Sequence, residues 1–262
     1  MIAIDDPDDP RVAAFRDVKE RDLAGRSGAF VIEGEVVLRI AARIGRFPID
    51  AVLLAEKRGP ALADVIALLP PETPVYLAGQ AVMDAIAGFP IHRGILALGR
   101  RGAAAAADLV LTTLPPRALV VGLFGIGNHD NMGGVFRTAA AFGADAVLLG
   151  PDCCDPLYRK AIRVSVGAAL TVPFGWFGAG DDPLAVLARH GVEALALSPS
   201  GTTPLSQVVR PARAALLLGA EGPGLDADML ARSATVSIPM SGGFDSLNLA
   251  TTSGVALYAL TR

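Results

Sequence analysis

The sequence predicts an α/β protein: a parallel sheet with helices on both faces, preceded by a smaller α/β layer. In the second half of the chain, apolar runs of strand length alternate with helical stretches. These runs lack the polar alternate positions of a strand with one wet face, which is typical of parallel strands covered on both sides. Hydrophobic residues make up 52% of the 262 residues, so we expect a large core.

A boundary between two domains is expected near residue 107, after the segment GRRGAAAAAD. We predict an N-terminal α/β domain with its linker over residues 1–107 and a larger domain over residues 108–262. In the first domain, residues 30–45 fit a strand followed by an amphipathic helix. Further strand-like and helical runs follow at residues 50–56, 59–69, 74–78 and 94–99.

The second domain is expected to alternate strands and helices throughout. The expected strands are residues 118–124, 144–150, 193–199, 213–219 and 235–240. The expected helices are residues 133–143, 155–165, 182–191 and 248–260. Ligands of such sheets bind beyond the carboxyl ends of the strands, so we expect the chemistry in the loops at those ends.

Composition and charge exclude several classes of protein. With a formal net charge of −3, the chain would have to hold a nucleic acid by local basic patches. The adjacent Cys153 and Cys154 suit neither a disulfide framework nor a metal site, which favours a reducing cytoplasm. His92, His129 and His190 lack ligand spacing, so no metal is expected. No apolar run reaches the ~20 residues of a membrane helix, and the acidic start predicts no export signal.

Three loops in the second half are rich in Gly, Asn, Ser and Pro: residues 125–134, 219–224 and 237–248. In the first loop, Asn131 is expected to cap a helix that carries Arg137. A Gly pair between them would let the main chain approach a ligand closely. The alternative is a capped helix with one surface arginine.

The second and third loops carry further polar side chains. Glu221 lies between glycines at a strand end, where a carboxylate needs a partner such as Arg137 or backbone N–H groups. The third loop leads into a helix, with Asp245 or Ser246 as candidate caps and Asn248 in the first turn. For these loops the alternatives are an ordinary tight turn and ordinary capping.

Taken in order, the three loops resemble the motifs of the SpoU (TrmH-type) RNA ribose 2′-O-methyltransferases of the SPOUT superfamily. The pattern N-x-G-x-(I/V)-x-R is met at Asn131–Arg137, and a G-x-E-G-x-G-like turn follows an apolar strand at Gly219–Gly224. The third motif, I-P-M and then S-L-N, is met at Ile238–Met240 and Ser246–Asn248. The resemblance covers about residues 117–262. The part before it resembles the substrate-binding domain that precedes the catalytic domain in many of these enzymes.

The resemblance implies a methyltransferase that uses S-adenosylmethionine to modify a ribose 2′-hydroxyl of rRNA or tRNA, without a metal. It also implies a C-terminal trefoil knot and a homodimer with the cofactor site near the interface. The catalytic residues that it implies are Arg137, Asn131, Glu221, Ser246 and Asn248. The cofactor-binding residues that it implies are Gly219, Ile238, Met240, Leu247, Ser198 and Leu218.

Arg137 is expected to act electrostatically. A guanidinium with a pKa above ~12 is a poor proton acceptor but stabilises negative charge on the ribose oxygen. Asn131 would hold Arg137 or the ribose, and Glu221 would orient the guanidinium. We therefore expect Arg137 within a side chain's reach of Gly219 and Ile238, in one subunit or across a dimer.

Arginine clusters are expected to hold the RNA. Arg39 and Arg43 share one helix face, and the alternative is a solvated face paired with Glu33 or Glu35. A second cluster is favoured because it follows a strand of the catalytic domain. It comprises Arg159, Lys160 and Arg163.

Two other functions fit parts of the sequence. One is a catalytically inactive RNA-binding or ribosome-assembly protein of the same fold, supported by Ala250, where many family members carry a hydroxyl. The intact Asn131 and Arg137 argue against it. The other is an NAD-dependent enzyme in which Asp152 binds a ribose, but the glycines of GLFGIGN lack the order of a dinucleotide motif.

Overall fold

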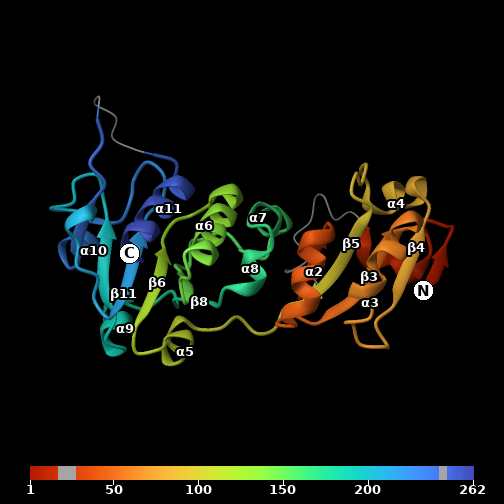
Figure 1. The fold of residues 1–262 in the computed structure, drawn as a ribbon, viewed down its shortest axis with the longest axis horizontal. Coiled ribbons are helices and arrows are strands. Elements are labelled where there is room, and N and C mark those ends of the chain that lie inside the picture. The colour runs from red at the N-terminus through yellow and green to blue at the C-terminus, as the bar shows by residue number, and fades with distance from the viewer. Residues whose placement is uncertain (17–27, 242–246) are drawn as a thin grey trace. The chain divides into compact units, whose positions relative to one another are not determined.

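The computed structural model describes residues 1–16, 28–241 and 247–262. These residues form two compact units (Figure 1). The first unit contains Met1–Ala103 and Leu157–Thr171, and the second contains Ala104–Pro156 and Val172–Arg262. Each unit has its own sheet.

The second unit is built on a seven-stranded sheet in which every pair of neighbours is parallel. The order across the sheet is β10 (Thr203–Pro204), β12 (Ala234–Ser237), β9 (Glu193–Leu197), β11 (Arg213–Leu218), β6 (Ala118–Leu123), β7 (Ala146–Leu149) and β8 (Phe174–Trp176). All of β6 is buried, because this strand has a neighbour on each side and helices on each face. The parallel sheet predicted from the unbroken apolar runs is confirmed.

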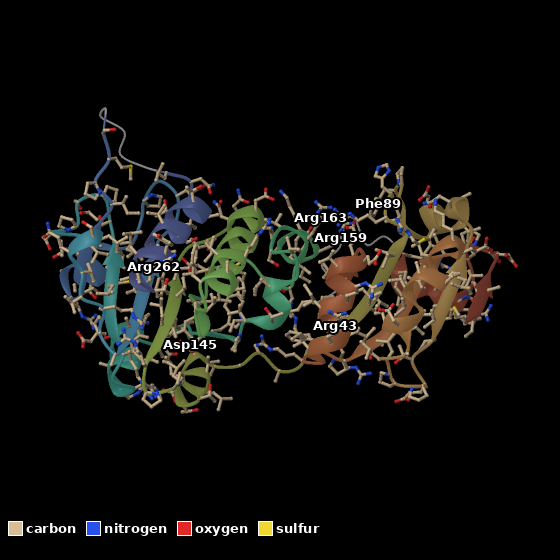
Figure 2. The ribbon with its side chains drawn as sticks, viewed as in Figure 1. Arg43, Phe89, Asp145, Arg159, Arg163 and Arg262 are labelled. Atoms are coloured by element: carbon tan, nitrogen blue, oxygen red, sulfur yellow. The ribbon has the colours of Figure 1, made fainter. Side chains whose placement is uncertain are left out.

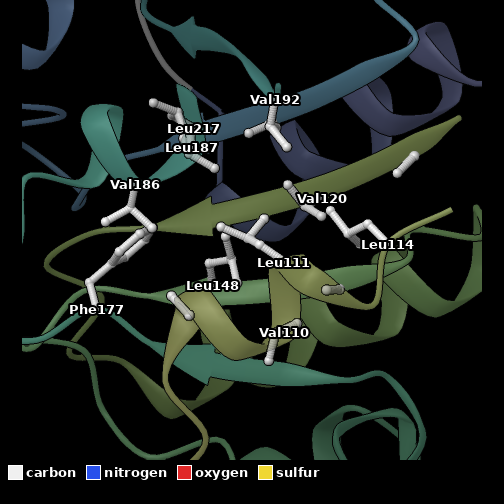
Figure 3. Packing of buried hydrophobic residues seen from close by; sticks show 14 of the residues in the cluster. Val110, Leu111, Leu114, Val120, Leu148, Phe177, Val186, Leu187, Val192 and Leu217 are labelled. Carbon is white, nitrogen blue, oxygen red and sulfur yellow. The ribbon is translucent and has the colours of Figure 1, made fainter. Parts of the chain in front are cut away.

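Helices cover both faces of this sheet. On one face, α5 (Ala107–Thr112), α9 (Pro183–Arg189) and α10 (Ala227–Ala231) share a core with alternate strand residues such as Val120 and Leu217 (Figure 3). On the other face, α6 (His129–Ala141) and α11 (Leu249–Leu260) pack against each other and contact β7 and β11. This α6–α11 pair brings the first and third loops together.

The first unit is built on a five-stranded mixed sheet. Its order is β1 (Ile2–Ile4), β4 (Val75–Ala78), β3 (Ile49–Ala55), β5 (Ile95–Arg100) and β2 (Ala29–Glu33), and β5 runs antiparallel to both of its neighbours. The helices that follow strands in this unit are α2 (Glu35–Ile44), α3 (Ala63–Ile66) and α4 (Gln80–Ala87). The 3-10 turn Pro10–Phe15 adds the buried Phe15 to the core.

A segment that the sequence assigned to the second domain packs with the first unit. Helix α7 (Arg159–Val164) contacts β2, and α8 (Ala168–Thr171) contacts α2. An added Cβ at Gly167 would lie 3.2 Å from the side chain of Ile40. The structure therefore differs from the division at residue 107, because a helical pattern in the sequence does not say which sheet the helix covers.

Candidate active site

A cavity of about 370 Å³ opens at the carboxyl ends of β9, β11 and β12 in the second unit. Its volume lies within the ~300–1,000 Å³ of small-molecule sites. Among its described lining residues, Glu221 is the one ionisable side chain. The cavity brings together every residue that we expect to bind the cofactor: Ser198, Leu218, Gly219, Ile238, Met240 and Leu247.

Main-chain atoms form one wall of this cavity at the second loop. A Cβ atom added to Gly219 would lie 2.1 Å from the carbonyl carbon of Gly224 and 2.3 Å from the nitrogen of Leu225. The turn is closed by a hydrogen bond of 3.0 Å from the Gly224 N–H to the Ala220 carbonyl. Only glycine fits at position 219, directly after the end of β11, without moving the turn.

A second, smaller cavity of about 150 Å³ lies beside the first. It is lined by the loop before α6, from Gly125 to Asn128, and by Asn131. Ala220, Glu221 and Leu249 line both cavities. A ligand in the larger cavity would therefore lie next to the start of α6.

Two asparagines join the first and third loops, in roles that differ from those predicted. The cap of α6 is Asn128, whose Oδ1 accepts from the Asp130 N–H at 2.8 Å. Asn131 is instead inside the helix, only 4% exposed. Its Oδ1 accepts from Asn248 Nδ2 at 3.0 Å. Asn248 in turn is the cap of α11, accepting from the Ala250 N–H at 3.0 Å, and not a residue of the first turn.

Small residues continue this contact along the two helices. A Cβ atom added to Gly134 would lie 2.4 Å from the Cβ of Ala250. One turn further, the hydroxyl oxygens of Thr138 and Ser253 are 2.8 Å apart. Ala250, which departs from the family pattern, is therefore part of a close helix–helix contact.

Arg137 and Glu221 are not paired. Both are exposed, and in the described part of the chain no ion pair joins them. Arg137 lies ~9 Å along α6 from Asn131 and about a quarter of a turn from the face that contacts α11. Within one chain, the predicted arrangement in which Asn131 and Glu221 hold this guanidinium is therefore not formed.

The remaining site residues divide into two groups. Ser246 and Asp245 lie outside the described residues. Thr252 and Pro199 line the larger cavity although the sequence analysis did not name them. Thr252 could have been found, because it is four residues after Asn248 and so lies on the same face of α11.

Both cysteines are free thiols; Cys153 is buried and Cys154 is half-buried. Burial raises the pKa of Cys154 to about 11, with smaller contributions from Cys153 and Asp155. Burial also raises the pKa of Cys153, whose Sγ donates to the Leu123 carbonyl at 3.2 Å. Both thiols are therefore protonated at neutral pH.

The arginines expected to hold RNA all lie in the first unit. Arg39 donates to Glu35 at 3.0 Å and also pairs with Asp64. For Arg39, the alternative of a helix face paired with a glutamate is therefore confirmed. Arg43, in the last turn of α2, is exposed (Figure 2). The expectation that the second cluster belongs to the catalytic domain is wrong, because α7 packs on β2.

Over the described ranges, no group of three or more His, Cys, Asp and Glu side chains is placed to hold a metal ion. None of the helices in those ranges has the length and apolar character needed to cross a bilayer. His190 contacts Asp108 at 3.0 Å, as expected of a hydrogen-bonded surface residue.

Comparisons with known proteins place this chain in a family. Residues 118–258 match the model of the SpoU rRNA methylase family. An uncharacterised tRNA/rRNA methyltransferase of Mycobacterium bovis is 39% identical, covering 98% of this chain and 90% of the relative. The 23S rRNA (guanosine-2′-O-)-methyltransferase RlmB of a Burkholderia species is 29% identical, covering 71% of this chain and 76% of the relative.

Solved structures show the same fold over nearly the whole chain. The SpoU methyltransferase AviRb of Streptomyces viridochromogenes, in complex with AdoMet, superposes with a TM-score of 0.82 at 21% identity, covering 97% of this chain and 98% of that one. The AdoMet-bound rRNA methyltransferase of Sinorhizobium meliloti gives 0.80 at 20% identity, covering 98% and 96%. The chain belongs to the SpoU rRNA methylase family, and the resemblance found in its three loops is confirmed.

Proposed function

We propose that this protein transfers a methyl group from S-adenosylmethionine to a ribose 2′-hydroxyl of rRNA or tRNA. The observation that carries the proposal is the single cavity lined by both Gly219 and Ile238, which come from different motifs of the family. Relatives of this chain are named tRNA/rRNA methyltransferase, and one is named a 23S rRNA (guanosine-2′-O-)-methyltransferase.

The cavity fits the proposed cofactor. Apart from the Glu221 carboxylate, its walls are largely main chain, aliphatic side chains and hydroxyls, which suit an adenosine ring and its ribose. The glycines 222 and 224 have open space where a Cβ would stand, so the turn leaves room for a ligand. Gly219, Ile238 and Leu247 would hold the base and ribose, and Ser198 and Met240 would line the same cavity.

The residues around the smaller cavity would position the acceptor. S-adenosylmethionine supplies an electrophilic methyl group on a sulfonium, so the protein needs to align a ribose oxygen and stabilise its developing charge. Asn131 and Asn248, bonded to each other, fix the start of α6 against the start of α11. Glu221 borders both cavities, where it would orient an arginine or the ribose.

We propose that Arg137 acts from the second subunit of a homodimer. In its own chain this guanidinium is exposed and does not line either cavity. Apolar side chains of α11, namely Val255 and Tyr258, are 42% and 48% exposed and are suited to a subunit interface. Arg137 of one copy would then stabilise the ribose oxygen bound at the other. We also propose that this chain has the trefoil knot of the family and lies in the cytoplasm, where its RNA substrates are.

A catalytically inactive RNA-binding role receives less support. Its one sequence argument was Ala250, and a methyl group at this position fits the contact with Gly134. Packing therefore accounts for the alanine without a loss of chemistry.

The test uses tritiated S-adenosylmethionine and two RNA preparations, deproteinised rRNA and bulk tRNA, from cells lacking the protein. Arg137→Ala is expected to lower methyl transfer by ~10²–10³-fold, because one charge-stabilising donor is removed. Calorimetry should show its affinity for S-adenosylmethionine within about twofold of the parent.

Arg189→Ala is the matched control, since Arg189 is an exposed arginine of the same unit, paired with Asp108 far from the cavity. Its turnover should equal that of the parent. Comparable turnover in Arg137→Ala would refute the role of Arg137, and a parent protein that binds no S-adenosylmethionine would refute the function.

A further inference from the structure

Three turns of the first unit meet at one edge of its sheet. Strands β2 and β3 end there, and the antiparallel β5 between them begins there. The Gly34 N–H donates to the Ile95 carbonyl at 3.1 Å, and the Ala55 N–H donates to the Gly94 carbonyl at 2.9 Å. Residues that follow β2 and β3 and precede β5 are therefore neighbours.

Arginines gather at this edge. A Cβ atom added to Gly34 would lie 3.0 Å from an Nη atom of Arg93, so this guanidinium lies over the β2–α2 turn. The stem of Arg58 lies next to Gly94, whose added Cβ would be 3.7 Å from its Cγ. Helix α7 adds Arg163 beside the end of β2. We call Arg58, Arg93 and Arg163 the arginine edge.

On the α7 side of this edge, one carboxylate contacts two arginines. Glu33, 12% exposed, accepts from Arg159 at 3.1 Å and lies 3.6 Å from Arg163. Arg159 is 18% exposed and also lies over the Phe89 ring at 4.7 Å, which fixes its position (Figure 2). Arg163 is 41% exposed and has only the longer contact, so its guanidinium is available to a stronger anion.

The other two arginines lack an anion in the described part of the chain. The Nε of Arg58 is buried there without a hydrogen-bond acceptor, and Arg93 is exposed with no carboxylate partner. Exposed Glu56 is the nearest acid in sequence and is followed by Lys57. Three other arginines of the unit are each paired with a carboxylate: Arg11 with Asp9, Arg39 with Glu35 and Arg100 with Asp50.

We propose that the arginine edge binds the phosphates of the substrate RNA, and that an RNA phosphate replaces Glu33 as the partner of Arg163. The inference rests on the proposed function in taking RNA as the substrate. Guanidinium groups on neighbouring turns match successive phosphates of a sugar–phosphate chain, to which they donate in pairs. Arg159 keeps Glu33 and Phe89 and holds α7 in place as a positioning residue.

The first experiment measures binding of fluorescently labelled bulk tRNA and, separately, deproteinised rRNA to the full chain across a range of salt concentrations. Arg93→Ala is expected to weaken binding of one or both RNAs by about fivefold near 0.1 M salt. The slope of log affinity against log salt should fall by ~0.7–0.9, one phosphate contact. The preferred RNA identifies the substrate class.

Arg100→Ala is the matched control, because Arg100 is an exposed arginine of the same sheet, held by Asp50 at the other end of β5. It should bind RNA as the parent does. Equal effects of the two substitutions would overturn the proposal. So would equally effective competition by polyglutamate at matched charge, which would mean that the surface prefers an acidic protein.

A second variant moves affinity in the opposite direction. Glu33→Gln removes the carboxylate that competes with RNA for Arg163, so binding should tighten by about two- to fivefold with a steeper salt slope. A misfolded protein would not bind more tightly, so unchanged or weaker binding would overturn the exchange at Arg163. The affinity for S-adenosylmethionine should be the same in each variant as in the parent. If the parent protein did not bind S-adenosylmethionine, the proposed function would be refuted instead.

Discussion

The two sheets of this chain carry different chemistry at the ends of their strands. In the second unit, Ser198, Gly219 and Ile238 directly follow strands and line a cavity in which Glu221 is the one ionisable side chain among the described residues. In the first unit, the corresponding turns carry Arg58 and Arg93 beside exposed surface. The same structural principle, loops at strand ends, therefore supports a cavity shaped by main chain in one unit and a cationic surface in the other.

The difference predicts how the affinity of each site should depend on salt concentration. A cavity lined mostly by main chain and uncharged side chains binds through shape and main-chain hydrogen bonds, so its affinity depends weakly on salt. A surface of guanidinium groups binds polyanions with release of counterions, so its affinity falls steeply with salt. Substitutions in the second unit test this contrast, in decreasing order of effect.

The largest effect is expected for Gly219→Ala. The new Cβ would meet main-chain atoms of Gly224 and Leu225, so the turn that forms the cavity wall has to move. We expect the Kd for S-adenosylmethionine to rise at least tenfold and the free energy of unfolding to fall by about 1–3 kcal/mol. Isothermal calorimetry and urea unfolding measure the two quantities.

Gly180→Ala is its control, since nothing lies within 4 Å of a Cβ at Gly180. This variant should match the parent in both measurements. If Gly219→Ala bound the cofactor normally, the wall of the cavity could not be main chain at this position, and the contrast between the units would fail.

A smaller effect is expected at the contact that holds the first and third loops together. Gly134→Ala would force α6 from Ala250 and should lower the free energy of unfolding by about 1–3 kcal/mol. Adding Ala250→Gly removes the opposing Cβ and should restore most of the loss. A double-mutant cycle by urea unfolding measures this coupling.

Strictly additive losses in that cycle would contradict the close contact. RNA affinity should stay constant across the four proteins of the cycle, because the arginine edge belongs to the other unit. A parallel loss of RNA binding would break the separation of the two sites.

The smallest effect is expected for Cys154, whose pKa tests whether this thiol of the second unit stays uncharged in the folded protein. Its folded pKa is about 11 against an ordinary 9.0, so the folded protein keeps this proton while the unfolded chain loses it. The stability contributed by the thiol is thus present below about pH 9 and is lost as the pH rises towards 11. In Cys153→Ala, alkylation by iodoacetamide should have its midpoint well above pH 9. The same chain unfolded in urea, with a midpoint near 9, is the reference, and equal midpoints would mean that Cys154 is not buried.

Much of the fold and family could be predicted from local sequence. Unbroken apolar runs predicted the parallel sheet, because a strand buried on both faces has no polar side. The three loops in order predicted the SpoU family, and the family match confirms it. Residues of the larger cavity, such as Gly219 and Ile238, could be named because the resemblance to the SpoU family implies them as cofactor-binding residues, and they line one cavity.

Other predictions were wrong for a shared reason. Asn131 was expected to be a cap and Asn248 a first-turn residue, whereas Asn248 caps α11 and bonds to the buried Asn131. Helix α7 was expected in the catalytic domain, yet it packs on β2. In each case the sequence pattern predicts a helix or a helix end but not its partner.

The periodicity of the elements, the glycines at their ends and the family can be read from the amino-acid sequence alone, since these depend on residues near one another along the chain. Long-range packing determines which asparagine caps and which one pairs, and which sheet α7 covers. It also determines that Arg137 is exposed and does not line the cavities of its own chain. The asparagine pair and the position of α7 depend on contacts between segments more than a hundred residues apart, and a local sequence pattern does not predict such contacts.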